Sequence, residues 1–311
     1  MHRASVQRKD KGYSKGVDMQ IGLIDVDGHN FPNLPLMKIS AYHNSLGDNV
    51  EFVTPIECKH YDKVYQSKVF TFTPDYDYCI SADDVQKGGT GYGLENKLPS
   101  CIENMCPDYG LYPQFSEAYG FLTRGCPRGC PFCIVAQKEG RKSVQVADLD
   151  NFYRGQKVIK LLDPNITACN DRERLFKQLI DSGAWIDFTQ GLDIRFVSGI
   201  EDLISKVKIK MLHFAWDNPE QDLTRYFQEF KKKTNLDERR LKVYVLTNFW
   251  STHEQDLYRV YKLREMGYDP YIMIYEKETA PRKTRQLQRW VNNKIIFRSC
   301  ERFEDYDCRG R

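Results

Sequence analysis

The sequence of 311 residues has no long apolar run, no marked excess of one charge and no repeated or low-complexity segment. No stretch approaches the roughly 18 to 20 apolar residues that cross a membrane, and the first residues have no apolar segment of a signal peptide. The 46 basic and 43 acidic side chains leave a net charge of +3, so bulk charge indicates no partner. The lack of a fixed repeat period excludes solenoids and propellers. These absences favour a cytoplasmic globular protein that makes no contact with a membrane.

What the sequence does contain, from about residue 118 onward, is an alternation of β-branched or aromatic runs with longer amphipathic ones. This alternation predicts β/α units and a parallel sheet. The predicted strands are 118–124, 157–163, 185–190, 209–217, 241–249 and 270–276. The predicted helices are 145–154, 171–182, 199–206, 219–233, 253–266 and 282–292. A full eight-unit barrel takes about 250 residues, so the length predicts a partial (β/α)6 barrel.

The amino-terminal part has a different pattern. A buried-type strand at 21–27, a helix at 36–46 and a strand at 49–53 predict a small Rossmann-like α/β domain, with one or two further strands within 63–73. The predicted domains are a disordered lead-in at 1–18, the Rossmann-like domain at 19–95, a linker at 96–117, the barrel at 118–298 and a carboxyl-terminal tail at 299–311.

Three of the ten cysteines, Cys126, Cys130 and Cys133, lie close together directly after the first predicted strand of the barrel. In a reducing compartment such clustering indicates a metal rather than disulfides. Three thiolates can hold three irons of a cubane cluster, which leaves the fourth iron open to a chelating molecule. The alternative is a structural zinc site with a fourth ligand such as Cys101 or Cys106, although the sequence lacks the second half of a usual zinc motif.

The spacing C-x3-C-x2-C, with Phe132 just before its last cysteine, on the loop after the first strand of a six-unit barrel, resembles the radical S-adenosylmethionine superfamily. The resemblance covers residues 118–298. It implies a 4Fe-4S cluster on Cys126, Cys130 and Cys133, with S-adenosylmethionine chelating the open iron and Phe132 among the cofactor-binding residues. It also implies reductive cleavage of that cofactor to a 5'-deoxyadenosyl radical, with the electron supplied by a reductant such as flavodoxin or ferredoxin.

The resemblance does not fix the reaction or the substrate, which is a small molecule, a peptide or RNA. Methyl or methylthio transfer to tRNA or peptide is an alternative within the superfamily. A non-enzymatic iron-sulfur or zinc-binding module is the alternative outside it. Two further cysteines, Cys300 and Cys308, are candidates with Cys101 and Cys106 for an auxiliary cluster.

Polar residues that follow the second and third strands of the predicted barrel are candidate cofactor ligands. Asp163 and Asn165 stand where the superfamily usually has Gly-Gly-Glu, and we expect one of them to take the amino group. Gln190, Asp193 and Arg195 follow the third strand. The resemblance implies that Arg195 pairs with the cofactor carboxylate and Asp193 with its ribose hydroxyls. The alternative is a local Asp193–Arg195 salt bridge.

Other residues of the barrel are expected to serve packing. His213 lies in the middle of a strand and is predicted to be a core histidine. The aromatic residues of the fifth and sixth strands are predicted to pack in the same way: Tyr244, Phe249, Tyr271 and Tyr275.

In the amino-terminal domain, Asp27 and His29 resemble part of the Asp-x-His-x-x-Gly signature of cobalamin-binding domains, which one branch of the superfamily carries. Ser67 and the pair Gly88–Gly89 resemble later signals of that domain. Pro32 replaces the glycine, and the segment is short for such a domain. We therefore predict a degenerate Rossmann-like unit that no longer holds cobalamin, with His29 as a cobalt ligand as the alternative.

Overall fold

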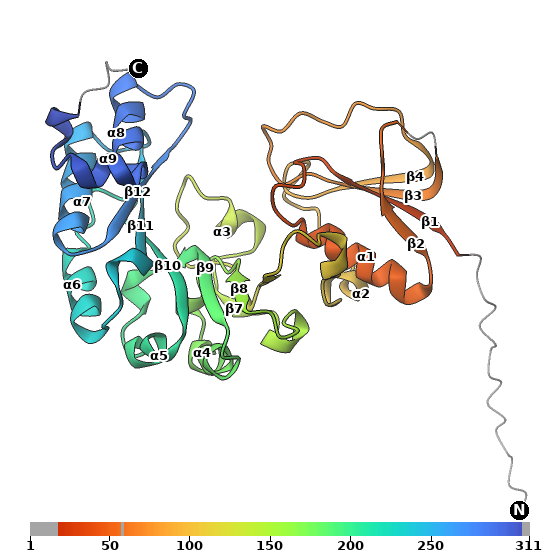
Figure 1. The fold of residues 1–311 in the computed structure, drawn as a ribbon, viewed down its shortest axis with the longest axis horizontal. Helices are drawn as coiled ribbons and strands as arrows, with labels where there is room; N and C mark the ends of the chain where they lie inside the picture. The colour runs from red at the N-terminus through yellow and green to blue at the C-terminus, as the bar shows by residue number, and fades with distance from the viewer. Residues whose placement is uncertain (1–17, 57–58, 307–311) are drawn as a thin grey trace, which may run out of the picture. The chain divides into compact units, whose positions relative to one another are not determined.

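The structure, a computed structural model, describes residues 18–56 and 59–306. Its mixed α/β class with parallel sheets confirms the predicted class. The chain divides into two compact units, Met1–Asp108 and Tyr109–Arg311 (Figure 1). The predicted lead-in at 1–18 lies outside the described residues apart from Asp18, as do residues 307–311 of the predicted tail. None of the helices within the described ranges is long and apolar enough to cross a membrane.

The first unit contains a four-stranded parallel sheet in the order β2-β1-β3-β4. Its elements are β1 (Gln20–Asp25), α1 (Leu34–Leu46), β2 (Asn49–Phe52), β3 (His60–Ser67), β4 (Ser81–Gly88) and the short α2 (Ser100–Glu103). Because the chain leaves β1 toward β2 and then returns to the other side of β1, the direction of winding reverses between β1 and β3.

Local sequence explains where α1 begins and ends. The side chain of Asn33 accepts a hydrogen bond from the backbone N–H of Leu36 at 3.3 Å, which caps the first turn. Pro35 occupies the first turn, where its missing N–H costs nothing. Gly47 ends the helix in the left-handed region with φ 89°.

Sequence analysis missed two elements of the first unit, strand β4 and the short helix α2. The residues of β4, SADDVQKG, are polar and mostly exposed, so they give no apolar pattern. Strand β3 ends at Ser67 rather than near residue 73, because the side chain of Asp27 accepts hydrogen bonds from the backbone N–H groups of Val69 and Phe70 and turns the chain away.

The second unit contains a six-stranded parallel sheet whose order, β5-β8-β9-β10-β11-β12, follows the chain. Its strands are β5 (Ala118–Gly120), β8 (Val158–Leu161), β9 (Trp185–Leu192), β10 (Ile209–Ala215), β11 (Leu241–Thr247) and β12 (Asp269–Ile274), and a separate antiparallel pair is formed by β6 (Thr123–Arg124) and β7 (Val144–Gln145). Its helices are α3 (Val135–Lys138), α4 (Arg172–Asp181), α5 (Glu201–Lys206), α6 (Thr224–Lys233), α7 (His253–Glu265), α8 (Arg282–Asn292) and α9 (Lys294–Ser299).

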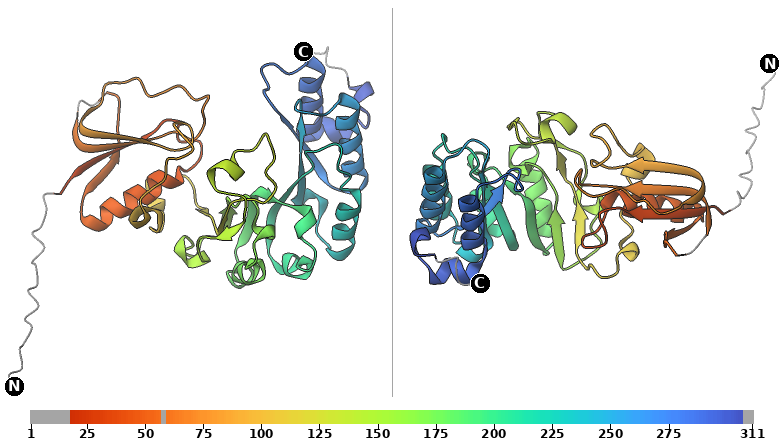
Figure 2. Two further views of the ribbon diagram at one scale, coloured as in Figure 1. Left: turned by 180° about the vertical axis from the view of Figure 1, so that it is seen from behind. Right: turned by 90° about the horizontal axis from the view of Figure 1, so that it is seen from above.

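Helices pack along one face of this sheet (Figure 2). Phe176 of α4 stacks on Phe188 of β9 with ring centroids 5.7 Å apart, and Phe214 of β10 contacts Phe230 of α6 edge to face at 5.1 Å. All four rings belong to one apolar core. Because parallel strands share one direction, their carboxyl ends lie at one edge of the sheet, where connecting loops collect functional side chains.

Two sequence predictions for the second unit are wrong. Residues 145–154 form no α-helix but a single 3-10 turn, η2 (Leu149–Asn151). The carboxylate of Asp148, expected within a helix, instead accepts hydrogen bonds from Arg174 and Gln178 of α4 and caps the short turn. The first predicted strand, 118–124, divides into β5 and β6, because its second half pairs antiparallel with β7.

Candidate functional site

The loop 125–134 carries the three clustered cysteines between β6 and α3, and we refer to it as the cysteine loop. The carboxylate of Glu139 closes this loop by accepting hydrogen bonds from the Arg124 guanidinium at 2.7 Å and from the backbone N–H of Gly125 at 3.1 Å. Gly125 has φ 84°, and a β-carbon there would lie 2.1 Å from a backbone oxygen. Only glycine therefore fits where the chain enters the loop.

The three thiols are close enough to influence one another. Burial raises the pKa of the Cys130 and Cys133 thiols, and the neighbouring thiols raise both pKa values further. The positive charge of Arg128 acts in the opposite direction on the pKa of Cys130. In the part of the chain that the structure describes, no group of three or more His, Cys, Asp or Glu side chains is gathered tightly enough to hold a metal ion. The donor set itself, soft sulfur atoms on one short loop, suits iron and sulfide rather than a hard cation.

Asn165, one of the predicted cofactor ligands, lies against the cysteine loop. It follows β8, is 3% exposed, and donates a hydrogen bond from Nδ2 to Cys126 Sγ at 3.5 Å. Its backbone oxygen accepts a hydrogen bond from Ser143 Oγ at 2.7 Å, which fixes the loop after β8 to the segment that follows the cysteine loop. The structure thus brings the end of β8 into contact with a thiol.

Asp163, the second residue predicted after β8, holds the backbone that leads into the cysteine loop. Its carboxylate accepts hydrogen bonds from the backbone N–H groups of Leu122 and Thr123 and from Thr123 Oγ1 at 2.7 Å. Burial raises the pKa of Asp163 to about 6, although these hydrogen bonds oppose the shift. Since both carboxylate oxygens accept hydrogen bonds from this backbone segment, Asp163 acts by positioning the loop.

Arg195 and Asp193, predicted after the third strand of the barrel, form a bidentate pair with each other. The Arg195 guanidinium donates from Nε at 2.7 Å and from a terminal nitrogen at 2.9 Å to the two oxygens of Asp193, and its other terminal nitrogen donates to Gln221 at 2.8 Å. This is the salt bridge that the sequence left as an alternative. Gln190 is an exposed residue of β9.

Arg128 connects the cysteine loop to this ion pair, which the sequence did not predict. Its guanidinium lies 3.7 Å from Asp193 Oδ2 and donates to Gln221 Oε1 at 3.2 Å. Gln221 follows β10 and accepts from Arg195 as well. The loops after β9 and β10 are therefore tied to the cysteine loop through one guanidinium.

Phe132, also predicted as a cofactor-binding residue, packs on aromatic rings that follow β11. Its ring meets Phe249 edge to face at 5.5 Å and Trp250 at 6.0 Å. Phe249 in turn contacts Tyr275, which follows β12, at 4.8 Å. Contacts to the cysteine loop thus come from the carboxyl ends of several strands, as expected for an active site on a parallel sheet.

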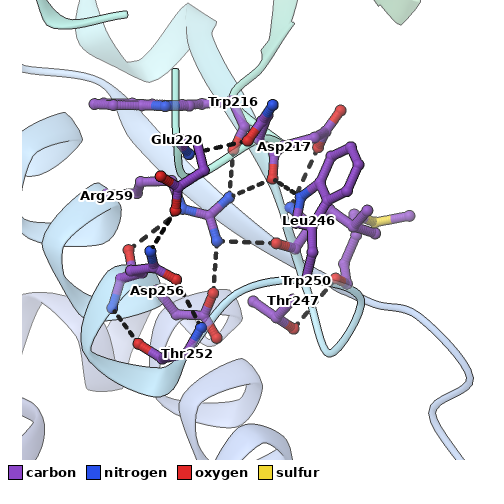
Figure 3. Close-up of polar contacts among 12 residues, drawn as sticks. Trp216, Asp217, Glu220, Leu246, Thr247, Trp250, Thr252, Asp256 and Arg259 are labelled. Carbon is purple, nitrogen blue, oxygen red and sulfur yellow. Dashed lines mark hydrogen bonds and ion pairs between the residues drawn. The ribbon is translucent and has the colours of Figure 1, made fainter. Parts of the chain in front are cut away.

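A buried guanidinium fixes the carboxyl ends of β10 and β11 (Figure 3). Arg259 of α7 is 1% exposed and donates to the backbone oxygens of Trp216 at 2.7 Å, Asp217 at 2.9 Å and Leu246 at 3.0 Å. The carboxylate of Asp256, one turn earlier on the helix, neutralises it at 2.5 Å. Carbonyl groups at strand ends lack strand partners, so the guanidinium satisfies them and sets their spacing.

Asp217 belongs to this network, and its charge acts on two thiols of the cysteine loop. Its Oδ1 accepts a hydrogen bond from the backbone N–H of Leu246 at 3.2 Å, and its backbone oxygen accepts one from Trp250 Nε1 at 3.2 Å. Burial raises the pKa of Asp217 to about 6, against the charges of Arg259, Arg195 and Arg128. A negative charge on Asp217 raises the pKa values of Cys130 and Cys133.

The two amino-terminal residues that resemble a cobalamin signature, Asp27 and His29, have different partners. Asp27 accepts hydrogen bonds from Val69, Phe70 and Thr73 and so holds the loop after β3. It is Asp25 whose carboxylate lies 4.0 Å from His29 Nδ1. The hydrogen bonds of Asp27 to the loop after β3 occupy its carboxylate, so Asp27 and His29 do not fit cobalamin as the signature requires. We derive no role for that cofactor.

The other two elements of that signature have local explanations. Ser67 Oγ donates to the side-chain oxygen of the helix cap Asn33 at 3.1 Å. A β-carbon on Gly89 would lie 2.3 Å from the backbone oxygen of Lys68, so the glycine permits a close approach of two chain segments. Of the cysteines considered for an auxiliary cluster, Cys101 and Cys106 belong to the first unit, Cys300 belongs to the second, and Cys308 lies outside the described residues.

We expect Arg259→Met to destabilise the second unit by about 3–5 kcal/mol, because the change leaves the carboxylate of Asp256 buried without its partner. Urea unfolding followed by tryptophan fluorescence reports on this unit alone, since it contains all four tryptophans: Trp185, Trp216, Trp250 and Trp290. The matched control is Arg225→Met, which removes an exposed arginine from an i,i+4 pair and should cost less than about 0.5 kcal/mol. Equal stability losses in the two variants would contradict a structural role for Arg259.

We expect Asp217→Asn to change how the stability of the second unit depends on pH. A carboxyl group with a raised pKa binds its proton more tightly in the folded chain, so its contribution to stability falls as pH rises from about 4 to about 6. The variant does not ionise. The free energy of unfolding of the variant minus that of the wild type should therefore increase by up to about 3 kcal/mol as the pH rises across this range. A difference between the two proteins that stays constant from pH 4 to pH 7 would disprove the assigned burial of Asp217.

No protein-family model matches the chain, and no curated protein is similar to it. The chemistry of the site therefore has to be inferred from its own residues. Those residues are the three thiols on one loop, the amide of Asn165 beside one of them, and the side chains that hold this loop to the carboxyl ends of the parallel strands.

Proposed function

We propose that this chain is a radical S-adenosylmethionine enzyme whose second unit is a partial (β/α)6 barrel. The observation that carries the proposal is the placement of three cysteines on one loop just beyond the first strand of a parallel sheet whose strand order follows the chain. The contact between Asn165 and Cys126 Sγ adds support, because it joins the loop to the end of the next strand.

Cys126, Cys130 and Cys133 would hold a 4Fe-4S cluster. When bound, such a cluster supplies the electron that cleaves S-adenosylmethionine to methionine and a 5'-deoxyadenosyl radical. The electron would come from a one-electron donor such as flavodoxin or ferredoxin. Because three thiols leave one iron without a protein ligand, the donor set is open in the way that a catalytic metal site requires.

The protein's part in this chemistry is to position groups and exclude water. Asn165 donates to a thiol sulfur, and hydrogen bonds to cluster sulfurs are one means by which proteins set a reduction potential. Asp163 fixes the backbone entering the loop. Phe132 holds the loop against Phe249 and Trp250, which follow β11. Asp193 and Arg195 are then available to a cofactor only if their mutual ion pair rearranges.

We expect the wild-type protein, reconstituted without oxygen, to contain about four irons and four sulfides per chain. With S-adenosylmethionine and a chemical reductant it should form 5'-deoxyadenosine. Cys126→Ala should lose both the iron and this product, because two thiols do not hold the cluster. The matched control is Cys79→Ala, which removes an exposed cysteine of the first unit and should keep both.

Metal analysis distinguishes the alternatives. One zinc per chain without iron would contradict the proposal and favour a structural metal module. A full iron-sulfur cluster with no S-adenosylmethionine cleavage would favour an electron-carrying module. Transfer of a methyl or methylthio group to tRNA or peptide would place the chain in a transferase branch of the same superfamily.

A further inference from the structure

A cavity of about 620 Å³ lies where the last turns of α7 meet α9 and the segment that follows α9. We call it the arginine cavity, and its lining residues are Tyr261, Arg264, Arg298, Glu301 and Arg302. Helix α7 begins after the carboxyl end of β11 and ends before the start of β12. Because β11 and β12 are parallel, the last turns of α7 lie toward the amino ends of the strands. The arginine cavity is therefore at the sheet edge opposite to the one that carries the cysteine loop.

One of the three arginines, Arg264, is held in place by its neighbours. Its guanidinium donates to the backbone oxygen of Glu301 at 2.7 Å and to the backbone oxygen of Phe297. The guanidinium carbon lies 4.0 Å from the centre of the Phe297 ring. These carbonyl groups belong to the last turn of α9 and to the segment after it, where helical partners run out. Arg264 is thus fixed by the fold, so an anion that binds to it costs little side-chain entropy.

The other two arginines keep their charges available to a ligand. Arg298 is exposed, and no residue that the structure describes forms an ion pair with it. Arg302 Nε lies 3.6 Å from a carboxylate oxygen of Glu304, but the two side chains are 72% and 56% exposed, so water weakens their attraction. Among the described residues, the lining carries three positive charges and the negative charge of Glu301. The cavity therefore keeps an excess of positive charge even when Glu304 is counted.

We propose that the arginine cavity binds a terminal phosphate group, either free phosphate or a phosphate monoester. Such a group has three oxygens that accept charge-assisted hydrogen bonds, and guanidinium groups donate to oxygens of this kind in pairs. One guanidinium satisfies both oxygens of a carboxylate, whereas several arginines around one space match a phosphate better. The place of the cavity, away from the cysteine loop, makes it a second site. No step of this inference uses the proposed function.

The test is a phosphorus NMR titration of the full chain at constant ionic strength with three probes. These are inorganic phosphate, the monoester thymidine 5'-phosphate and the dinucleotide thymidylyl-thymidine, whose phosphate is a diester. The first two should bind in a saturable way and more tightly than the diester. Equal affinity for them indicates free phosphate as the ligand, and tighter binding of thymidine 5'-phosphate indicates a phosphate ester.

Two substitutions in the lining should change phosphate affinity in opposite directions. Arg298→Gln should weaken binding about tenfold, because it removes a charged hydrogen-bond donor. Glu301→Gln should tighten binding about threefold, because it removes a negative charge from the lining. Arg264 is not substituted, since it also holds the end of α9. If thermal unfolding shows that Arg298→Gln does not fold, Arg302→Gln takes its place.

The matched control is Arg282→Gln, which removes an exposed arginine from the first turn of α8, outside the cavity lining, and should leave phosphate affinity unchanged. Three results would overturn the inference: no saturable binding of phosphate or its monoester, tighter binding of the diester, or equal losses in Arg298→Gln and Arg282→Gln. The last result would mean that affinity follows net charge alone. None of them affects 5'-deoxyadenosine formation by the reconstituted protein, so failure of this site and failure of the proposed function can be told apart.

Discussion

The parallel direction of six strands in chain order is the constraint on which the second unit depends. It places the carboxyl ends of all six strands at one edge of the sheet. The backbone groups there that have no strand partner need hydrogen bonds from side chains. Asp163 supplies them for the segment before the cysteine loop, and Arg259 supplies them for the ends of β10 and β11. Both side chains are buried, and each holds its backbone segment by several hydrogen bonds. The cysteine loop is thus positioned by the same interactions that complete the sheet.

Charge pairing decides what each polar group at this edge does. The guanidinium of Arg195 donates hydrogen bonds to both oxygens of Asp193. Arg128 of the cysteine loop lies near the same carboxylate. The resulting contacts make one connected network of guanidinium groups and acids around the thiols.

Sequence reasoning succeeded where the signal is local. The apolar strands of the second unit and the start of α7 after its cap Thr252 follow from neighbouring residues. It failed where the partner is distant in the sequence. Asp148 resembles a helical residue in the sequence, but its partners are Arg174 and Gln178 of α4. Strand β4 is mostly polar and exposed. Arg259, with Asp256 one turn before it, looks like an ordinary exposed helix pair, yet both are buried. Tyr244 and His213 were predicted to pack, and their rings stack on each other with centroids 5.0 Å apart.

The most direct test of the account is electron paramagnetic resonance of the anaerobically reconstituted, reduced protein, recorded with and without S-adenosylmethionine. If three thiols leave one iron open, the cofactor binds that iron and shifts the spectrum of the reduced cluster. Replacement of Cys126 by alanine should abolish the signal. A reduced cluster whose spectrum is identical with and without S-adenosylmethionine would contradict the account, because it would mean that no open iron is present.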